Sequence, residues 1–325
     1  MPTIQVAPAR FIQLHHEDQE GVRAELRAGL ALSPARVSPK YLYDPLGSRL
    51  FDAITELPEY YPTRTEAAIF AAHGPAMAAA VHAAVGTDLT WIDLGAGDGA
   101  KSARLFPLMR PRRYVPVDIS VAYLRDGVTR LAREHPGIEM VGLGLDFSQR
   151  LQLPAELPGG PAVVFYPGSS IGNFAPQDAL RLMREAREAS GGGALLIGVD
   201  LVKASDILEP AYDDALGVTA AFNLNLLKHV NALIGADFHV RDWAHVAFFN
   251  TAESRIEMHL QARRDVTVSF DGGQRAFAAG ERMHTENSYK WTLPGFKALL
   301  HDAGWRDVQH WTDERGWFGV FLALA

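Results

Sequence analysis

The sequence contains no cysteine among its 325 residues. Disulfide bonds, thiolate metal sites and cysteine nucleophiles are therefore excluded. It also lacks an excess of positive charge, because 31 basic residues face 38 acidic ones and the net charge is −7. This balance excludes a strongly basic nucleic-acid-binding protein, and the net field of the chain would attract neither DNA nor an anionic membrane.

Long uninterrupted apolar runs are also missing. The beginning of the sequence, MPTIQVAPARF, lacks the apolar run of a signal peptide. The most apolar stretch, residues 67–85, is interrupted by His73, Gly74, Pro75 and His82. We therefore expect one or two alanine-rich helices there rather than a membrane span. We expect a soluble, cytoplasmic protein without nucleic-acid or membrane partners, and the acidic composition favours a monomer.

Strand and helix patterns alternate from residue 89 to residue 201. Five short apolar segments indicate strands: LTWIDL, YVPVDI, IEMVGLGLDF, PAVVFYPG and ALLIGVDL. Helical spacing separates them, for example over residues 121–134 and 177–189. The alternation predicts an α/β fold with a parallel sheet that carries helices on both faces. A helix over residues 293–303 and two strands joined by a turn at Gly316 predict a closing antiparallel hairpin.

The length suggests two domains. We assign residues 65–200 and 291–325 to the α/β domain. Residues 12–64 and 201–290 would form a second, α+β domain, with the polar residues 1–20 loosely held. In this second domain we expect a helix over residues 219–234, strands over 244–249, 255–262 and 266–270, and a turn at Gly272–Gly273. We also expect Thr65 to cap a helix.

A glycine-rich turn, DLGAGDGAK (residues 93–101), separates the first strand from a helical stretch that runs to Met109. Its glycines allow a sharp turn and a close approach of a ligand to the backbone. Asp118 ends the next strand, where a ribose-binding carboxylate is expected. The turn also satisfies the looser dinucleotide pattern G-x-G-x-x-A. The glycines alone therefore leave open a nicotinamide cofactor, S-adenosylmethionine and a purely structural turn.

Three features favour S-adenosylmethionine. Asp93 lies two residues before Gly95, which resembles the acidic-x-G-x-G pattern of class I methyltransferases, where that acid lies near the methionine moiety. Asp146 and Phe147 end the third strand, where those enzymes hold adenine. The C-terminal hairpin also resembles theirs. The expected fold is thus a class I methyltransferase Rossmann-like sheet. The alternatives are that Asp93 pairs with a helix and that Asp146 caps a turn.

A second motif predicts different chemistry. Residues 168–172, GSSIG, match the G-x-S-x-G spacing of a hydrolase nucleophile elbow. Downstream acids and histidines supply the required order: Asp213, Asp214, His301 and His310. However, Pro176 delays the helix that should follow the serine, and no HGGG-type segment precedes it. We therefore favour a loop that lines a ligand cleft at the carboxyl end of a strand.

Longer segments resemble one particular family. They are YLYDPLGSRLFDAITELPEYYPTRTE, DLGAGDGAK, VPVDIS, LDF, FYPGSSIGNF, GVDLVK, AYDDALGVTAAFNLNLL, SRIEMHL and TENSYK. Together they are similar to the histidine-specific N-α-methyltransferases of ergothioneine biosynthesis. These enzymes trimethylate the α-amine of histidine to give hercynine. The resemblance covers nearly the whole chain.

The resemblance assigns roles to individual residues. Gly95, Gly97 and Lys101 would belong to the cofactor loop, with Lys101 pairing with the methionine carboxylate. Asp118 would bind the ribose hydroxyls, and Asp146 with Phe147 the adenine. On the substrate side, Asn173 and Tyr212 would hold the carboxylate and the amine, with Tyr43 and the loop at Gly168 beside the reacting amine. The imidazole pocket would comprise Tyr60, Met258, Glu286 and Ser288.

Methyl transfer from a sulfonium to a neutral amine needs positioning and no metal. The aromatic faces of Tyr43 and Phe51 would stabilise a trimethylammonium product. Each of these side chains also has an ordinary structural interpretation: aromatic core packing, bracing of a turn, or a charge on a strand face. Alternative functions are methylation of tryptophan or a thiolated histidine, non-catalytic binding of an adenosyl ligand, and nicotinamide-dependent oxidoreduction.

Overall fold

We describe the fold from a computed structural model, which covers residues 9–14, 19–154, 157 and 160–325. The chain divides into two compact units. Unit 1 comprises Met1–His16, Arg64–Leu201 and Trp291–Ala325, and unit 2 comprises Glu17–Thr63 and Val202–Lys290. The internal boundaries lie within a residue or so of the predicted ones. The difference is at the beginning of the chain, where residues 12–14 fall in unit 1.

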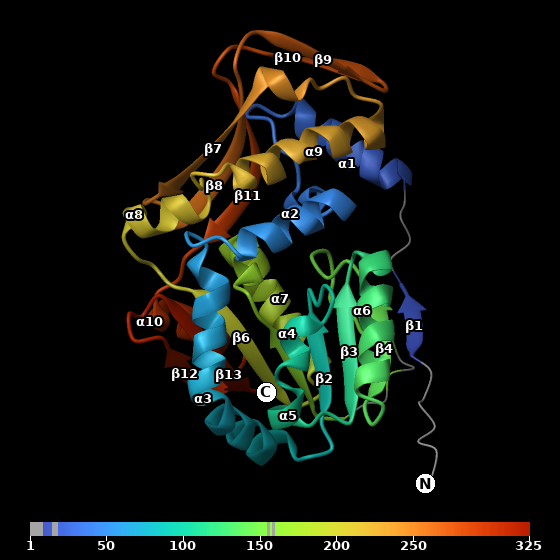
Figure 1. Cartoon of the computed structure of the whole chain (residues 1–325), viewed down its shortest axis with the longest axis vertical. Coiled ribbons are helices and arrows are strands. Elements are labelled where there is room, and N and C mark those ends of the chain that lie inside the picture. Colours follow the sequence, from blue (N-terminus) through green and yellow to red (C-terminus); the bar gives the residue numbers. More distant parts are fainter. Residues whose placement is uncertain (1–8, 15–18, 155–156, 158–159) are drawn as a thin grey trace. The chain divides into compact units, whose positions relative to one another are not determined.

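Unit 1 is built on one eight-stranded sheet (Figure 1). Its spatial order is β1 (Arg10–Gln13), β4 (Glu139–Gly144), β3 (Arg113–Asp118), β2 (Thr90–Leu94), β5 (Ala162–Tyr166), β6 (Ala194–Asp200), β13 (Phe318–Leu324) and β12 (Arg306–Thr312). The strands from β1 to β6 are parallel. Strand β13 runs antiparallel to β6, and β12 runs antiparallel to β13. The predicted parallel sheet with a C-terminal antiparallel hairpin is therefore confirmed.

The first described strand differs from the prediction of a loosely held N-terminal segment. Strand β1 pairs in parallel with β4, with Arg10 opposite Val141. A Cβ atom on Gly142 would lie 2.7 Å from the Phe11 ring, so the absence of a side chain there lets the ring settle on the strand. The guanidinium of Arg125 lies 4.6 Å from the centre of the same ring. These packing contacts explain why β1 belongs to the sheet.

Helices cover both faces of this sheet, as the sequence predicted. On one face, α3 (Tyr61–Val85) and α6 (Val121–Glu134) pack on a core that includes Trp91, Tyr114 and Phe165. On the other face, α7 (Pro176–Ala189) and α10 (Leu293–Asp302) pack on a core that includes Ile92, Val115 and Val164. Side chains of β2, β3 and β5 thus alternate between two buried layers.

Prolines explain two helix boundaries that the sequence analysis misjudged. Helix α3 begins at Tyr61 rather than after Thr65, because Pro62 in the first turn needs no hydrogen-bond acceptor. The helical stretch before Met109 is two short helices, α4 (Ala100–Ala103) and α5 (Phe106–Met109). Pro107 has no N–H to donate to a preceding carbonyl, so one continuous helix is interrupted there.

Helix α3 continues through Pro75 as a single helix. By length and composition alone, with a mean hydropathy of 1.4, it meets the criteria for a membrane span. A core helix of a soluble protein meets the same criteria. Ile69, Phe70, Met77 and Val81 are buried in the core of unit 1.

Unit 2 contains a three-stranded antiparallel sheet in the order β11 (Arg282–Tyr289), β8 (Arg255–Ala262) and β7 (Trp243–Asn250). Strands β9 (Val266–Phe270) and β10 (Gly273–Phe277) form a separate hairpin. The turn of that hairpin has Gly272 at φ +89°, as the glycine pair predicted. Strands β10 and β11 were not predicted.

The helices of unit 2 come from both of its chain segments. They are α1 (Gln19–Ala31), α2 (Pro45–Thr55), the short α8 (Ser205–Leu208) and α9 (Val218–Ile234). Asp44 accepts a hydrogen bond from the Gly47 amide (2.7 Å) at the start of α2. The same carboxylate oxygen accepts one from the Asn225 side chain of α9 (2.7 Å). This carboxylate therefore joins the two segments of the unit.

Candidate active site

The glycine-rich turn follows β2 and leads into α4. Gly95, Gly97 and Gly99 have φ values of +68°, +56° and +73°, a region that residues with a side chain rarely adopt. Asp118, at the end of β3, accepts a hydrogen bond from the Gly97 amide (2.9 Å) and another from the Ser120 amide (2.8 Å). Burial raises the pKa of Asp118. The structure thus brings the predicted ribose-binding carboxylate against the predicted loop.

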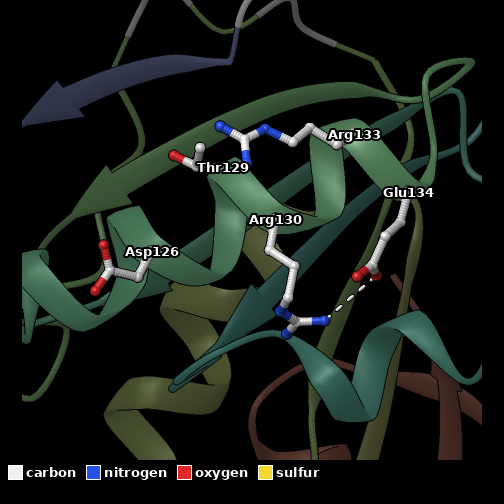
Figure 2. A pocket seen from close by; sticks show the side chains of 5 residues that line it. All are labelled: Asp126, Thr129, Arg130, Arg133 and Glu134. Carbon is white, nitrogen blue, oxygen red and sulfur yellow. Dashed lines mark hydrogen bonds and ion pairs between the residues drawn. The ribbon is translucent and has the colours of Figure 1, made fainter.

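Helix α6 packs closely on this turn. A Cβ atom on Gly127 would lie 2.5 Å from the carbonyl oxygen of Asp98. Arg130 donates hydrogen bonds to the Asp98 carbonyl (3.0 Å) and carboxylate (3.1 Å). Figure 2 shows Arg130 with Glu134, its partner one helical turn away, in a hollow also lined by Asp126, Thr129 and Arg133. All five side chains come from α6, and among them Arg130 contacts the turn at Asp98.

Asp93 lies buried at the end of β2, 2% exposed. Its Oδ2 accepts hydrogen bonds from Ser102 Oγ (2.6 Å) on α4 and from the Tyr114 hydroxyl (2.7 Å). Burial raises its pKa from 3.8 to about 6. Within the described part of the chain, Oδ1 is buried without a hydrogen-bond partner. Pairing with a helix, which was the alternative interpretation of Asp93, thus accounts for Oδ2 but not for Oδ1.

This arrangement fits S-adenosylmethionine. A buried carboxylate oxygen without a donor suits a ligand that brings a positively charged amino group, because leaving such an acceptor unpaired is costly. The neighbouring turn offers backbone amides without side chains, to which a ligand can approach closely. Asp118 adds a carboxylate of the type that accepts ribose hydroxyls.

The predicted adenine pair lies after β4. Asp146 accepts hydrogen bonds from Ser148 Oγ (2.5 Å) and from the Gln149 side chain (3.1 Å). The structure therefore shows Asp146 bracing its turn, which was the alternative interpretation of this residue. The Phe147 ring lies beside the glycine-rich turn, because a Cβ atom on Gly95 would be 3.8 Å from it. Asp146 and Phe147 thus lie just after β4, at the edge of the sheet that carries the cofactor loop.

Lys101 lies in a small ionic cluster. Its Nζ is 2.9 Å from Glu66 Oε2, and Glu66 is 1% exposed. The other oxygen of Glu66 accepts a hydrogen bond from the Gly168 amide (2.7 Å). Glu66 thus connects α3, the glycine-rich turn and the loop after β5. The sequence analysis missed Glu66, although it lies in the long motif that ends YYPTRTE.

The loop after β5 does not form a nucleophile elbow. Ser170 begins a short 3-10 helix, η2 (Ser170–Asn173), instead of an α-helix. The residue with the strained conformation is Ser169 (φ +59°), whose hydroxyl accepts a hydrogen bond from the Asp200 amide (2.8 Å). Asn173 ends η2 and is half-buried. The loop therefore presents Gly168 and Asn173 at the carboxyl edge of the sheet.

Three other residues of the hydrolase alternative, Asp214, His301 and His310, have structural contacts. Asp214 accepts hydrogen bonds from the Val218 and Thr219 amides at the start of α9. The His301 ring bonds the Trp305 carbonyl (3.2 Å). The His310 ring stacks on Phe321. These contacts and the 3-10 turn provide no basis for a serine nucleophile.

In unit 2 the predicted aromatic residues form one cluster. The ring centres of Tyr43 and Phe51 are 5.6 Å apart, and those of Phe51 and Tyr60 are 6.1 Å apart. Tyr60 lies 6.3 Å from Tyr212. Phe222 of α9 completes the cluster, 5.6 Å from Tyr43 and 6.1 Å from Phe51. The sequence analysis did not select Phe222, because a phenylalanine on an apolar helix is indistinguishable from ordinary core.

Two of the predicted imidazole contacts, Glu286 and Ser288, lie on β11, and Lys290 directly follows the last residue of this strand. Glu286, Ser288 and Lys290 alternate along the chain, and they are 7%, 5% and 3% exposed. Two-residue spacing places the side chains of Glu286 and Ser288 on one face of β11. Met258 of β8 is the register partner of Glu286. Buried charged residues are rare in proteins unless they are paired, so this row is unusual for a strand.

The hydroxyls of Tyr212 and Ser288 meet at 2.7 Å. Lys290 Nζ donates to both, at 2.8 Å each. The Tyr212 carbonyl is bonded by the His245 ring (2.8 Å), and burial lowers the pKa of His245. The structure therefore brings Tyr212 and Ser288 together and adds Lys290, which the sequence analysis had not selected although it ends the motif TENSYK.

Among the described residues there is no group of three or more His, Asp or Glu side chains arranged to hold a metal ion. The predicted site residues divide between the units. Unit 1 carries the cofactor residues with Gly168 and Asn173, and unit 2 carries the aromatic cluster with Met258, Glu286 and Ser288.

Comparison with known proteins shows to which family the chain is similar. Residues 22–325 match the sequence model of a family described as histidine-specific methyltransferase, SAM-dependent. The histidine N-alpha-methyltransferase of Mycolicibacterium smegmatis is 42% identical over 94% of this chain and 95% of that protein. The enzyme of the same name from Mycobacterium tuberculosis is 40% identical over 93% of this chain and 94% of that protein.

A more distant relative is ergothioneine biosynthesis protein 1 of Schizosaccharomyces pombe, which is 29% identical over 73% of this chain and 32% of that protein. The family resemblance predicted from the motifs is confirmed by these matches.

Proposed function

Because the chain belongs to the family of S-adenosylmethionine-dependent, histidine-specific methyltransferases, we propose that it trimethylates the α-amine of L-histidine to hercynine, a step of ergothioneine biosynthesis. The observation that carries the choice of histidine is the buried pair of Glu286 and Ser288 on one face of β11. A carboxylate and a hydroxyl complement the two ring nitrogens of an imidazole.

The residues of unit 1 would hold the cofactor. The amides of the glycine-rich turn and Asp118 would bind its ribose end, and Phe147 would lie against adenine. Asp93 Oδ1 would accept from the methionine amine. Lys101 has three N–H donors, so it can bond Glu66 and still pair with the methionine carboxylate. When bound, S-adenosylmethionine supplies an electrophilic methyl group on a positively charged sulfur.

The residues around the amine have a positioning task. An in-line displacement requires a neutral amine with its lone pair directed at the methyl group, and correct orientation contributes much of the rate. Asn173 and Tyr212 would hold the carboxylate of the amino acid. Tyr43 would lie beside the amine. The proton that the amine releases before each transfer would pass to water, either directly or through the Tyr43 hydroxyl, which would give up its own proton as it accepts one.

The aromatic cluster suits the later stages of the reaction. Each methyl group removes an N–H donor, and the final trimethylammonium carries a permanent charge with no donor left. The faces of aromatic rings attract such cations. Tyr43 and Phe51, with ring centres 5.6 Å apart, would provide these faces.

We further propose that the protein acts as a cytoplasmic monomer on the free amino acid, without a metal ion, nucleic acid or membrane. The net charge of −7 supports the exclusion of nucleic-acid and anionic membrane surfaces.

The test is mass spectrometry of the purified protein incubated with S-adenosylmethionine and a mixture of free amino acids. We expect histidine to be consumed while its mono-, di- and trimethylated forms appear. Methylation of tryptophan or another amino acid in place of histidine would overturn the assignment of Glu286 and Ser288. Cofactor binding without any methylated product would contradict the catalytic function.

A further inference from the structure

Glu66 of α3 is a buried carboxylate to which the proposed function assigns no role. The residue is 1% exposed, and its two oxygens have different partners. Oε2 accepts a hydrogen bond from Lys101 Nζ (2.9 Å), and Oε1 accepts one from the Gly168 amide (2.7 Å). Burying a carboxylate is costly unless a charge and hydrogen bonds compensate it. Lys101 supplies the charge, and Gly168 supplies the second hydrogen bond.

The sheet of unit 1 leaves room for this carboxylate. Gly198 lies within β6, a strand whose seven residues are all buried. A Cβ atom on Gly198 would overlap Glu66 Oε1. Any other residue at this position would therefore displace the carboxylate or the strand. The position of Glu66 is thus fixed from two sides, by its hydrogen-bond donors and by the backbone of β6.

The two donors come from different loops of the sheet. Lys101 lies in α4, directly after the glycine-rich turn, and Gly168 lies in the loop after β5. A Cβ atom on Gly168 would be 3.0 Å from Lys101 Nζ, so the backbone of this loop packs against the ammonium. Glu66 therefore joins the predicted cofactor loop to the loop that the proposed function puts beside the reacting amine.

The ion pair fixes the tip of a side chain that is otherwise partly exposed. The Lys101 side chain is 39% exposed. A long side chain loses rotamer freedom when it binds an anion, and this loss lowers affinity. The bond to Glu66 removes that freedom before a ligand arrives, and such preorganisation raises affinity. An ammonium has three donors, so a bond to Glu66 leaves donors for a ligand.

We propose that Glu66 is a positioning residue that fixes Lys101 for the carboxylate end of S-adenosylmethionine. This proposal rests on the proposed function, because it takes Lys101 as the partner of the methionine carboxylate. The role requires a carboxylate, since each donor faces its own oxygen. An amide of the same size has one oxygen and one NH2 group, so it accepts from one donor and turns its own donor toward the other.

The test is calorimetry of Glu66→Gln with two probes, S-adenosylhomocysteine and 5′-methylthioadenosine. Both contain adenosine and a thioether sulfur, but only S-adenosylhomocysteine has the amino-acid end. We expect its affinity to fall about tenfold, as is typical when a charge-assisted hydrogen bond is weakened. The affinity for 5′-methylthioadenosine should change less than about twofold, because this probe has no carboxylate for Lys101 to bind.

Glu139→Gln is the matched control, because Glu139 also forms an ion pair within unit 1, with Arg113 (2.7 Å). It should leave both affinities unchanged. A merely structural role of Glu66 predicts equal losses for the two probes, together with lower thermal stability. Equal losses, or an unchanged affinity for S-adenosylhomocysteine, would overturn the proposal. A gain in that affinity would also overturn it, because Glu66 would then only weaken the charge of Lys101.

A double variant keeps the test decisive if Glu66→Gln folds poorly. Replacing both partners of a buried ion pair by apolar side chains of similar length costs little stability, so Glu66→Met with Lys101→Met should fold. Because Glu66 acts through Lys101, this double variant should bind S-adenosylhomocysteine as Lys101→Met alone does. Weaker binding by the double variant would refute the mechanism.

The same measurements separate this proposal from the proposed function. If the unmodified protein does not methylate histidine, the proposed function fails. If Lys101→Met binds both probes as the unmodified protein does, the assignment of Lys101 to the methionine carboxylate fails, and the proposal for Glu66 fails with it. If Lys101→Met loses affinity for S-adenosylhomocysteine alone and Glu66→Gln does not, only the role of Glu66 fails.

Discussion

The candidate contacts of the two units differ in kind: they include backbone groups in unit 1 and are side chains in unit 2. In unit 1 the glycine-rich turn exposes backbone amides, and Asp118 is fixed by accepting from two of them, those of Gly97 and Ser120. In unit 2 the candidate contacts are side chains, from Tyr43 near the beginning of the unit to Lys290 at its end. A backbone site depends on the absence of side chains, whereas a side-chain site depends on their identity.

This difference predicts how each part responds to substitution. Backbone-lined sites tolerate almost no added atoms, because close packing transmits any displacement to the ligand. Side-chain-lined sites can exchange one chemistry for another while the fold persists. We therefore expect substitutions in unit 1 to affect cofactor affinity broadly and those in unit 2 to affect the choice of amino acid.

The largest effect should follow from Gly127→Ala. The new Cβ would lie 2.5 Å from the backbone carbonyl oxygen of Asp98, so α6 and the glycine-rich turn must move apart. We expect affinity for S-adenosylmethionine, measured by calorimetry, to fall by about a hundredfold, since small displacements in a preorganised site have effects of this size. Gly74→Ala is the matched control, because its Cβ would meet only the end of the Leu108 side chain. Equal cofactor affinity in both variants would contradict the backbone interpretation of unit 1.

Glu286→Leu should have the next largest effect, and it should concern histidine rather than the cofactor. An imidazole N–H would lose its buried acceptor, and we expect kcat/KM for histidine to fall about thirtyfold. Cofactor affinity should not change. The exposed Glu253, replaced in the same way, is the control. A loss of cofactor affinity that parallels the loss of histidine turnover would show that cofactor binding and amino-acid binding do not depend on separate units.

Asp93→Asn should lower cofactor affinity about tenfold, by removing one charge from a charge-assisted hydrogen bond. Its effect on stability has the opposite sign. Because burial raises the pKa of Asp93 from 3.8 to about 6, the folded state binds this proton more tightly than the unfolded state does. Ionisation of Asp93 therefore lowers the free energy of unfolding of the ligand-free protein.

The loss of free energy of unfolding caused by ionised Asp93 is absent below about pH 4. It grows between the two pKa values and is complete above about pH 6. Urea unfolding across this range should show the difference in free energy of unfolding between Asp93→Asn and the unmodified protein changing by about 3 kcal/mol in favour of the variant from the lower end to the upper end. Asp88→Asn, at an exposed carboxylate of unit 1, should show no such trend. A constant difference between the Asp93 variant and the unmodified protein over this pH range would be inconsistent with the raised pKa.

The smallest effect concerns the aromatic cluster. Phe51→Leu keeps an apolar side chain and removes a ring face, so we expect the affinity for hercynine to fall about threefold, the size of an exposed cation–π contact. Histidine, with a smaller and less alkylated amine, should be affected less. Phe248→Leu, at a ring that stacks on His259 in β7 and β8, is the control. Equal losses for hercynine and histidine would argue against a role in holding the trimethylammonium.

The contrast between the units also explains how much the sequence could predict. The sheet of unit 1 follows from apolar strands alternating with helices, and helix α6 has the predicted bounds, Val121–Glu134. The glycine-rich turn is contiguous in the sequence, so its position was found without a relative. Strand β1 was missed because its four residues become a strand only by pairing with β4.

The site of unit 2 was found only through the family resemblance. Tyr43, Tyr212 and Glu286 lie far apart in the chain, and no local pattern connects them. Lys290 of this unit and Glu66 of unit 1 were missed even so, because each works through a contact with another residue. Glu66 holds Lys101, and Lys290 holds Tyr212. Such roles appear only when two distant segments are placed together.

Unit 2 is made of two stretches that are separated in the chain by the greater part of unit 1. In terms of recombination, it is one structural module that is encoded by two separate segments. Helix α2 of the first stretch depends on α9 of the second, since Asp44 accepts from the Asn225 side chain. A chimera that takes its substrate preference from a relative must therefore import both stretches together. A single crossover would combine Tyr43, Phe51 and Tyr60 from one parent with Tyr212, Phe222 and strand β11 from another.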